Sequence, residues 1–157
     1  MTDQIYNFFT TDMIYMWLTI GVLPFWGILF FFPQSRICKI FVTSVFPIIV
    51  FVAVDSYLLF ELYRNKFDFL YAFNLYLNLN ELTNIMADKN YLILFWVHFL
   101  AINLFCGSWI VRDYQKTSMP KFLAFFPLLL TYFIGPIGLF FYWILRIFYS
   151  KKIDLYE

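Results

Sequence analysis

The sequence predicts an all-α integral membrane protein, a four-helix bundle that forms a single domain over residues 1–157. Two observations support this prediction. Of the 157 residues, 63% are hydrophobic and 13% are charged, which leaves too few charged side chains for the surface of an ordinary water-soluble protein. Four apolar stretches also reach the roughly 20 residues that a helix needs to cross about 30 Å of hydrocarbon. They are Met13–Phe32, Ile40–Leu62, Tyr91–Val111 and Phe122–Phe148.

The connectors differ in length and composition. The first two predicted helices are joined by the short segment QSRICK, so we expect them to be antiparallel neighbours. The connector over residues 63–90 alternates apolar and polar residues. It is too polar to cross a membrane, yet apolar enough to lie along the interface as amphipathic helix or irregular coil. An ordinary polar loop is the alternative. Pro120 precedes the last predicted helix, where proline suits a helix start.

Glycine and proline are concentrated inside the predicted helices. All five glycines and four of the six prolines lie there, so we expect kinked helices notched by small residues. The pair Gly135-Pro136 removes a side chain and a backbone donor at adjacent positions, which predicts a bend. Such kinks can open a slot between helices for a long ligand. Close helix packing and simple tolerance of proline are the alternative.

Lysine and arginine near the helix ends indicate the orientation in the membrane. The first and third connectors hold five of them and the opposite side holds six, so the two counts nearly cancel. The two sets are Arg36, Lys39, Arg112, Lys116 and Lys121, against Arg64, Lys66, Lys89, Arg146, Lys151 and Lys152. No basic residue precedes the first apolar run, which argues against a cleaved signal peptide. We expect a multi-pass protein of the bacterial inner membrane.

Several classes of function lack support in the sequence. A net charge of +1 gives no field to attract nucleic acid, so we expect no nucleic-acid partner. Cys38 and Cys106 are too few for a disulfide framework and form no CxxC pair. Dinucleotide, P-loop and serine-hydrolase motifs are absent. One histidine cannot supply the ligands of a membrane di-iron oxygenase, so we expect neither a metal site nor a cofactor. Acid–base chemistry on a lipid-soluble molecule is the remaining enzymatic option.

Two ionisable residues, Asp55 and His98, lie inside predicted helices, where a charged side chain is costly and usually faces a bundle interior. Asp55 is seven residues from Leu62 and His98 is seven residues from Tyr91, which places both about 10 Å from the same interface. If they meet, the carboxylate fixes the imidazole tautomer and raises its basicity, which makes a catalytic proton-transfer pair. A polar contact that only locks two helices together is the alternative.

Asn103 lies five residues after His98, so the two side chains point to adjacent faces of one helix. Asn103 can hold a ligand oxygen, or it can make an interhelical hydrogen bond worth about 1 kcal/mol. An aromatic content of 25% suits a conjugated ligand, although membrane packing and interfacial belts also explain it. The predicted ligand-binding residues are Asn103, Trp96, Phe105, Trp109, Gly135 and Pro136.

A longer motif runs through the second half of the chain. It comprises WVHFLAINLF, a later aspartate and proline, GP-x-G and a terminal arginine, and the first half adds LPFWGILFFFP and SVFPIIVFVAVDSYLL. These segments resemble the family named for the plant abscisic-acid-deficient-four protein, small four-helix membrane proteins implicated in making neoxanthin from violaxanthin. The resemblance covers nearly the whole chain. The matching motif positions are Trp96, His98, Leu100, Ala101, Leu104, Phe105, Asp113, Pro120, Gly135, Pro136, Gly138 and Arg146.

Two positions depart from the family pattern. The family usually has an acid where this chain has Asn103, and commonly has an arginine where this chain has Ser108. Losing both charges together is what the loss of an ion pair looks like, because either charge alone would be left unpaired in a low dielectric. Asp55 matches no motif position of the family.

The resemblance implies carotenoid chemistry. Conversion of an epoxide such as violaxanthin into an allenic alcohol is an isomerisation that needs an acid at oxygen and a base at carbon. We therefore expect cofactor-free isomerisation of a carotenoid, of an apocarotenoid such as retinal, or of another conjugated isoprenoid. In this hypothesis His98 carries the proton, Asp55 orients the His98 ring and Asn103 donates a hydrogen bond to a ligand oxygen.

Two alternatives to isomerisation stay open. One is a non-enzymatic protein that binds carotenoid or retinal, or that serves as an assembly subunit for a partner membrane enzyme or photoprotein. The other is cleavage of the polyene to an apocarotenoid such as retinal, with oxygen activation supplied from elsewhere. The expected partners are accordingly the lipid bilayer and a hydrophobic isoprenoid ligand, with a membrane protein partner in the assembly hypothesis.

Overall fold

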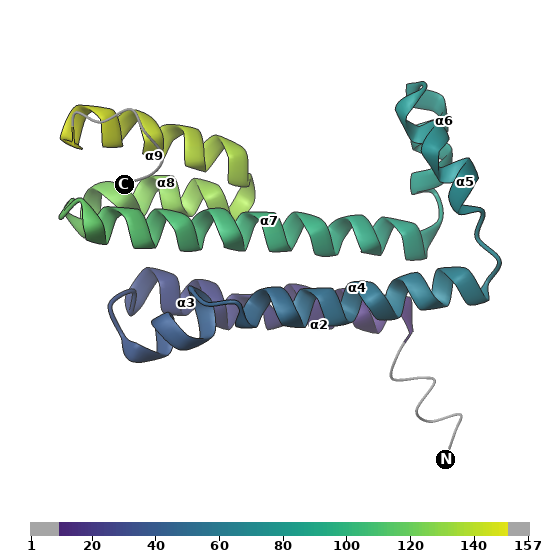
Figure 1. Cartoon of the computed structure of the whole chain (residues 1–157), viewed down its shortest axis with the longest axis horizontal. Coiled ribbons are helices and arrows are strands. Elements are labelled where there is room, and N and C mark those ends of the chain that lie inside the picture. Colours follow the sequence, from purple (N-terminus) through teal and green to yellow (C-terminus); the bar gives the residue numbers. More distant parts are fainter. Residues whose placement is uncertain (1–9, 151–157) are drawn as a thin grey trace, which may run out of the picture. The chain divides into compact units, whose positions relative to one another are not determined.

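The computed structural model describes residues 10–150, and within that range it is all-helical, without a β-strand (Figure 1). Three segments are long and apolar enough to cross a membrane: Thr11–Phe31, Cys38–Arg64 and Lys89–Lys116. They match the first three predicted spans with shifted ends, and they are the spans of a membrane protein. The elements in chain order are α2 (Thr11–Gly21), α3 (Leu23–Phe31), η1 (Cys38–Val42), α4 (Phe46–Arg64), α5 (Phe69–Ala72), η2 (Phe73–Tyr76), α6 (Leu79–Met86), α7 (Lys89–Lys116), α8 (Lys121–Phe133) and α9 (Gly135–Ser150).

These elements divide into two compact units. Unit 1 contains residues 10–21 and 48–99, which form α2, most of α4, the helices of the long connector and the first part of α7. Unit 2 contains residues 22–47 and 100–150, which form α3, η1, the rest of α7, α8 and α9. The single domain predicted over residues 1–157 stays a prediction. Lys151 and Lys152, and most of the amino-terminal arm, lie outside the described residues.

Proline interrupts the first two spans. Pro24 lies in the first turn of α3 and has no N–H to donate to the carbonyl of Ile20, so α2 ends at Gly21. Pro47 occupies the same place in α4, after a break at residues 43–45. The element before that break, η1, is a short π-helix, in which the N–H of Thr43 donates to the carbonyl of Cys38, five residues earlier, at 2.9 Å.

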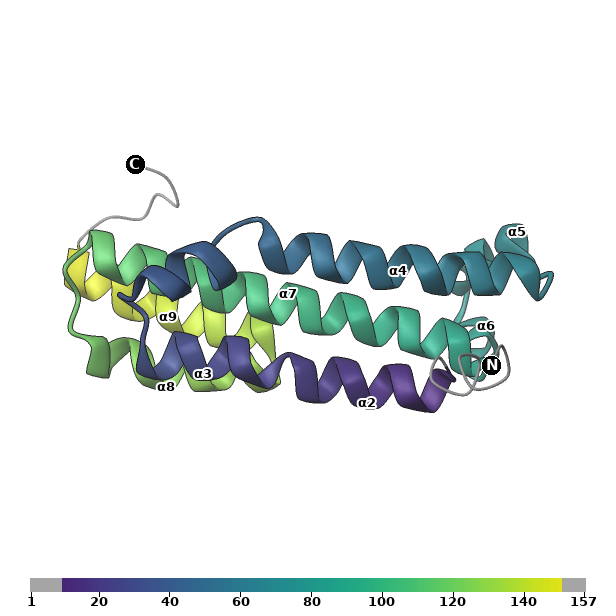
Figure 2. The same cartoon turned by 90° about the horizontal axis from the view of Figure 1, so that it is seen from below.

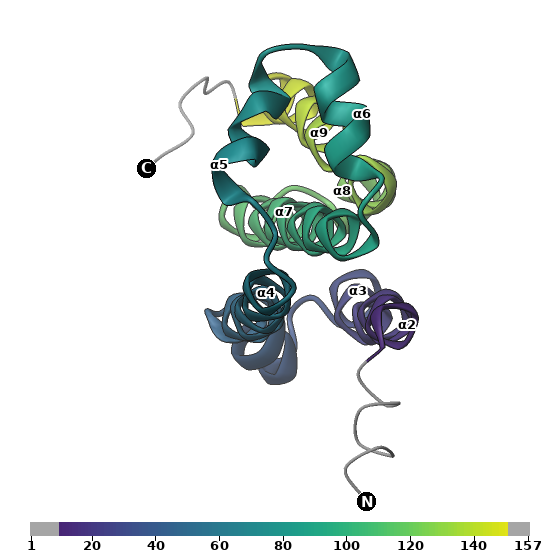
Figure 3. The same cartoon turned by 90° about the vertical axis from the view of Figure 1, so that its right-hand side faces the viewer.

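Three helices of unit 1 lie side by side: α2, α4 and the first part of α7 (Figure 2). Figure 3 shows them nearly end on, and α4 runs antiparallel to α7. Leu58 and Leu62 of α4 and Val97 of α7 are buried. The outward faces of α4 are apolar and uncovered, with Ile49 and Phe60 both exposed, as expected for helices that face lipid.

The long connector of unit 1 folds into short helices at the end of the unit where α4 ends and α7 begins, and α6 stands crosswise to α7 (Figure 1). The Asp68 carboxylate accepts the first free N–H groups of α5, and the Asn78 side chain caps α6. The Tyr71 hydroxyl donates to Glu81 at 2.5 Å, and this bond raises the pKa of the Tyr71 phenol. Large apolar side chains of the connector remain exposed, including Leu70, Phe73, Tyr76, Leu77 and Leu79. The connector is thus helical rather than an ordinary loop, and its interfacial location stays a prediction.

The fourth predicted span, Phe122–Phe148, is not a single helix, so the structure does not confirm a four-helix bundle. It forms α8 and α9, which have 13 and 16 residues. At 1.5 Å per residue both are shorter than the roughly 30 Å of a hydrocarbon core. The chain reverses at Ile134, and α9 runs back beside α8 (Figure 1). The Tyr149 hydroxyl accordingly donates to the carbonyl of Ser118 at 3.3 Å, next to the start of α8.

The α8–α9 hairpin corrects two predictions. The bend predicted at Gly135-Pro136 is a complete reversal of the chain. The four predicted spans place Arg146 on the side opposite the third connector. In the structure its Nε lies 2.7 Å from the Asp113 carboxylate, near the end of α7 that leads into that connector, so Arg146 lies on the connector's side. Gly138 allows α9 to pack this closely on α8, because a Cβ at this position would collide with the backbone of Thr131.

Candidate functional site

Asp55 of α4 and His98 of α7, the two ionisable residues whose equal depth made a contact possible, lie next to each other in unit 1. Asp55 lies nine residues before Arg64 and His98 nine residues after Lys89, so antiparallel packing brings them to the same depth. The Asp55 Oδ1 is 3.8 Å from the His98 Nδ1. The Asp55 side chain is 19% exposed and the His98 side chain is 59% exposed. The pair is therefore a largely covered carboxylate beside an imidazole that reaches the surface.

A backbone carbonyl orients the His98 ring. The His98 Nδ1 lies 2.8 Å from the carbonyl oxygen of Leu94, one turn earlier. A carbonyl can only accept, so Nδ1 bears the proton and Nε2 is the basic atom of the neutral ring. The Asp55 Oδ1 is too distant for a hydrogen bond, and it has no such partner among the described residues. Leu94 rather than Asp55 sets the tautomer, and the carboxylate acts on His98 through its charge.

The Nε2 of His98 is the atom that can exchange a proton with a ligand. It forms no hydrogen bond with the residues that the structure describes. An imidazole at an apolar surface can take a proton from a membrane-dissolved molecule and return it, and the nearby carboxylate stabilises the charged ring in between. Among residues 10–150, no three histidine, cysteine, aspartate or glutamate side chains are grouped to hold a metal ion.

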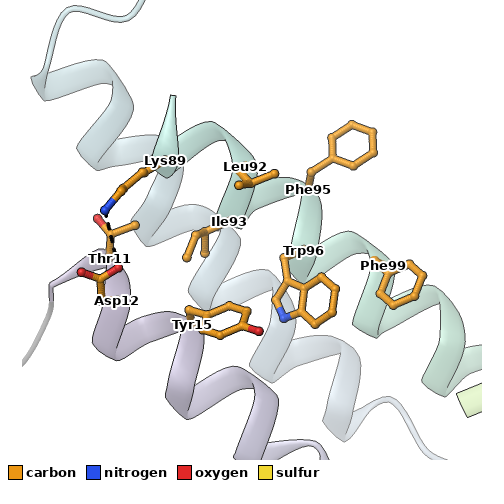
Figure 4. Close-up of a pocket in the computed structure, with 9 residues that line it drawn as sticks. All are labelled: Thr11, Asp12, Tyr15, Lys89, Leu92, Ile93, Phe95, Trp96 and Phe99. Carbon is orange, nitrogen blue, oxygen red and sulfur yellow. Dashed lines mark ion pairs between the residues drawn. The ribbon is translucent and has the colours of Figure 1, made fainter. Parts of the chain in front are cut away.

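A groove of about 440 Å³ lies between α2 and α7 of unit 1 (Figure 4). Trp96 forms its central wall, and its Nε1 donates to the Thr19 hydroxyl at 3.2 Å. The Phe99 ring stacks on Trp96 with a centroid separation of 5.2 Å. The Tyr15 ring of α2 lies 5.8 Å from the Trp96 ring and is tilted by 43° against it. His98 does not line this groove. The lining residues are Thr11, Asp12, Tyr15, Lys89, Leu92, Ile93, Phe95, Trp96 and Phe99.

Asn103 lies in unit 2, where its amide holds the turn between α8 and α9. Its Oδ1 accepts from the Gly135 N–H at 3.0 Å, and its Nδ2 donates to the Tyr132 carbonyl at 3.3 Å. These backbone groups lie where one helix ends and the next begins, so they need partners from outside the helices. A Cβ at position 135 would collide with Asn103, so the close contact also requires glycine there. The predicted contact of Asn103 with a ligand oxygen stays a prediction.

Ser108 and Asn103, the two departures from the family pattern, bond to different elements. The Ser108 hydroxyl donates to the Val42 carbonyl of η1 at 3.2 Å, whereas Asn103 bonds to the α8–α9 turn. The two polar side chains therefore have separate packing roles in this chain.

The remaining predicted ligand-binding residues of unit 2 have different surroundings. Phe105 is exposed on α7. Trp109 is half-buried, and its ring meets the Tyr142 ring edge-on at 5.8 Å. Pro136 is exposed in the first turn of α9. Their contact with a ligand stays a prediction.

A buried polar cluster joins α7 to α9, and the sequence did not predict it as a unit. The Asp113 Oδ2 accepts from the Tyr142 hydroxyl and from the Arg146 Nε, both at 2.7 Å. All three side chains are buried. Asp113 and Arg146 match motif positions of the family to which the sequence assigns no role, and Tyr142 belongs to no motif. The four-residue spacing of Tyr142 and Arg146 on one helix face was the available signal. Because the cluster is closed to solvent and lipid, it anchors α9 rather than receiving a ligand.

Comparison with protein families adds a finding to this geometry. A family model described as ABA DEFICIENT 4-like matches residues 13–142. The match includes Asp55, His98 and the residues of the α8–α9 turn. No curated protein and no solved structure matches the chain.

Proposed function

The chain belongs to the ABA DEFICIENT 4-like family, and on that premise we propose that it isomerises a carotenoid or related conjugated isoprenoid by proton transfer at His98. Membership in this family links the chain to carotenoid and neoxanthin metabolism. The three apolar spans belong in a membrane, which is where such hydrophobic substrates dissolve.

The observation that supports proton transfer is the juxtaposition of Asp55 and His98 within two candidate spans. An ionisable side chain at membrane depth is costly, and here two of opposite sign lie 3.8 Å apart. The Asp55 Oδ1 is buried without a hydrogen bond, so a positive charge on His98 offsets the cost of that carboxylate.

The proposed reaction needs no electron donor or acceptor. For an epoxide substrate, Nε2 of His98 takes a proton from the carbon bonded to the epoxide, and the electrons of that C–H bond form a new double bond to the epoxide carbon. The C–O bond of the epoxide breaks, and its oxygen receives the proton back as a hydroxyl. The product has the atoms of the substrate. Asp55 stabilises the imidazolium that exists between the two proton transfers.

Expression in a host that accumulates epoxidised carotenoids tests this proposal, with pigments compared by chromatography. Wild type should form a new pigment, and His98→Ala should form none. Asp55→Asn should form it at least about tenfold more slowly, since a loss of about 1.4 kcal/mol of charge stabilisation corresponds to that factor. Ser56→Ala is the matched control, because this exposed neighbour of Asp55 bonds only to the Val52 carbonyl of its own helix. A new pigment formed at full yield by His98→Ala would refute the proton role.

A further inference from the structure

The groove between α2 and α7 is a straight stripe along α7. Its lining residues on that helix recur at every turn, from Lys89 through Ile93 and Trp96 to Phe99. Ten residues at 1.5 Å each give a length of about 15 Å along the helix axis. The stripe begins at Lys89, the first residue of the candidate span, so the Lys89 end of the groove is nearer the end of that span than the Phe99 end.

Aromatic side chains of both helices line the groove. Trp96 is held by its hydrogen bond to Thr19 and by stacking on Phe99. Tyr15 faces Trp96 across the space between the two helices, whereas the Phe95 ring points away (Figure 4). A rigid conjugated rod can pack against aromatic rings along a straight stripe, because a rigid ligand loses little conformational entropy when it binds. A flexible acyl chain gains no such advantage from these walls.

The Lys89 end of the groove offers a donor and an acceptor. The Lys89 Nζ lies 3.9 Å from the Asp12 Oδ1, and their side chains are 76% and 87% exposed. An ion pair so exposed contributes little to stability, so its partners can turn to a ligand at small cost. A hydroxyl group suits both, since it donates to the carboxylate and accepts from the ammonium.

We infer that this groove binds one hydroxylated end of a carotenoid, with the hydroxyl between Asp12 and Lys89 and the polyene against Tyr15 and Trp96. The inference rests on the proposed function for the class of ligand. The site is separate from the reaction centre, because His98 does not line the groove. It holds a carotenoid without taking part in proton transfer.

Titration of the purified protein in detergent tests the groove, with the induced circular dichroism of the polyene as the signal. The probes are zeaxanthin and β-carotene, which share a polyene and differ by the ring hydroxyls. Wild type should bind zeaxanthin at least about fivefold more tightly, as one hydrogen bond to a charged group predicts. The double variant Asp12→Asn with Lys89→Met should lose that preference. Its matched control is Glu61→Gln with Arg64→Met, which removes a surface ion pair outside the groove.

A second pair of variants tests the aromatic wall. Tyr15→Leu should weaken the binding of both probes severalfold, whereas Tyr63→Leu, at an exposed site on α4 outside the groove, should leave it unchanged. Equal binding of the two probes by wild type, or binding by Tyr15→Leu equal to that of wild type, would overturn the inference. So would loss of the zeaxanthin preference when phospholipid is added, which would identify a lipid site.

The groove inference and the proposed function can be refuted independently of each other. His98→Ala should keep the affinity and preference of the groove while it forms no new pigment. If wild type binds zeaxanthin as described but converts no pigment, the proposed function is wrong and the groove stands. If conversion depends on His98 but Tyr15→Leu binds like wild type, the groove inference is wrong and the proposed function stands.

Discussion

Replacement of Asn103 by leucine tests whether this side chain holds the α8–α9 hairpin. Leucine has nearly the shape of asparagine but neither donates nor accepts, so Asn103→Leu removes both bonds without opening a large cavity. The Gly135 N–H and the Tyr132 carbonyl then lose partners at 3.0 and 3.3 Å. Asn103 is 2% exposed, so water cannot readily replace the lost partners.

The magnitude follows from these two bonds. A buried backbone group left without a partner costs about 1–3 kcal/mol in water-soluble proteins, and interhelical bonds in membranes average about 0.6 kcal/mol. The bond to Gly135 is the shorter and dominates. We expect Asn103→Leu to lower the free energy of unfolding by about 2 kcal/mol, roughly a thirtyfold change in the ratio of folded to unfolded protein.

The two cysteines of the chain provide the assay. Cys38 and Cys106 are free and buried, so a thiol-reactive fluorogenic dye labels them when unit 2 unfolds. Unfolding in detergent can be followed for wild type, Asn103→Leu and the control Asn80→Leu, an exposed site on α6. If Asn103→Leu and wild type differ by less than about 0.5 kcal/mol, the amide does not hold the turn.

Three further predictions concern unit 2. By the same thiol assay, Gly138→Ala should destabilise the fold by about 1–3 kcal/mol, because the added methyl group collides with α8. The control Gly27→Ala should be neutral or stabilising, because a Cβ at that position meets nothing within 4 Å. Equal effects of the two variants would contradict the described packing. Arg146→Met should abolish most of the monodisperse protein in size-exclusion chromatography, because it leaves the buried Asp113 carboxylate without its cationic partner, at a cost of about 3–5 kcal/mol. Adding Asp113→Asn to Arg146→Met should restore part of the monodisperse protein. If Arg146→Met loses no monodisperse protein, the ion pair does not anchor α9. Cysteines introduced at the start of α8 and the end of α9 should react with a membrane-impermeant maleimide from the same side, whereas reaction from opposite sides would indicate a single fourth span.

The sequence predicted the three spans because long apolar runs specify membrane helices almost by themselves. Gly135-Pro136 predicted a bend, but the sequence did not reveal that the bend is a complete reversal, because no polar residue marks the turn. Ile134, Gly135 and Pro136 are apolar, and the polar partner of the turn, Asn103, comes from a different helix. Hydropathy therefore sums α8 and α9 into one apparent span.

The candidate site shows the same limit. Equal distances from the helix ends predicted that Asp55 and His98 lie at the same depth, but spacing alone left open whether their side chains meet, and the packing of α4 against α7 brings them to 3.8 Å. The bond that sets the histidine tautomer goes to the carbonyl of Leu94, and a backbone partner leaves no trace in residue types. Tyr15 and Lys89 were not predicted to line a groove either, because only packing shows which faces of α2 and α7 meet.

The mass of the product tests the central claim most directly. The purified protein in lipid nanodiscs would be incubated with an epoxidised carotenoid, and substrate and product would be compared by chromatography and mass spectrometry. Isomerisation at His98 predicts a new compound with the mass of the substrate, formed by wild type and Ser56→Ala but not by His98→Ala. Shorter fragments, a gain of oxygen, or full product formation by His98→Ala would contradict it.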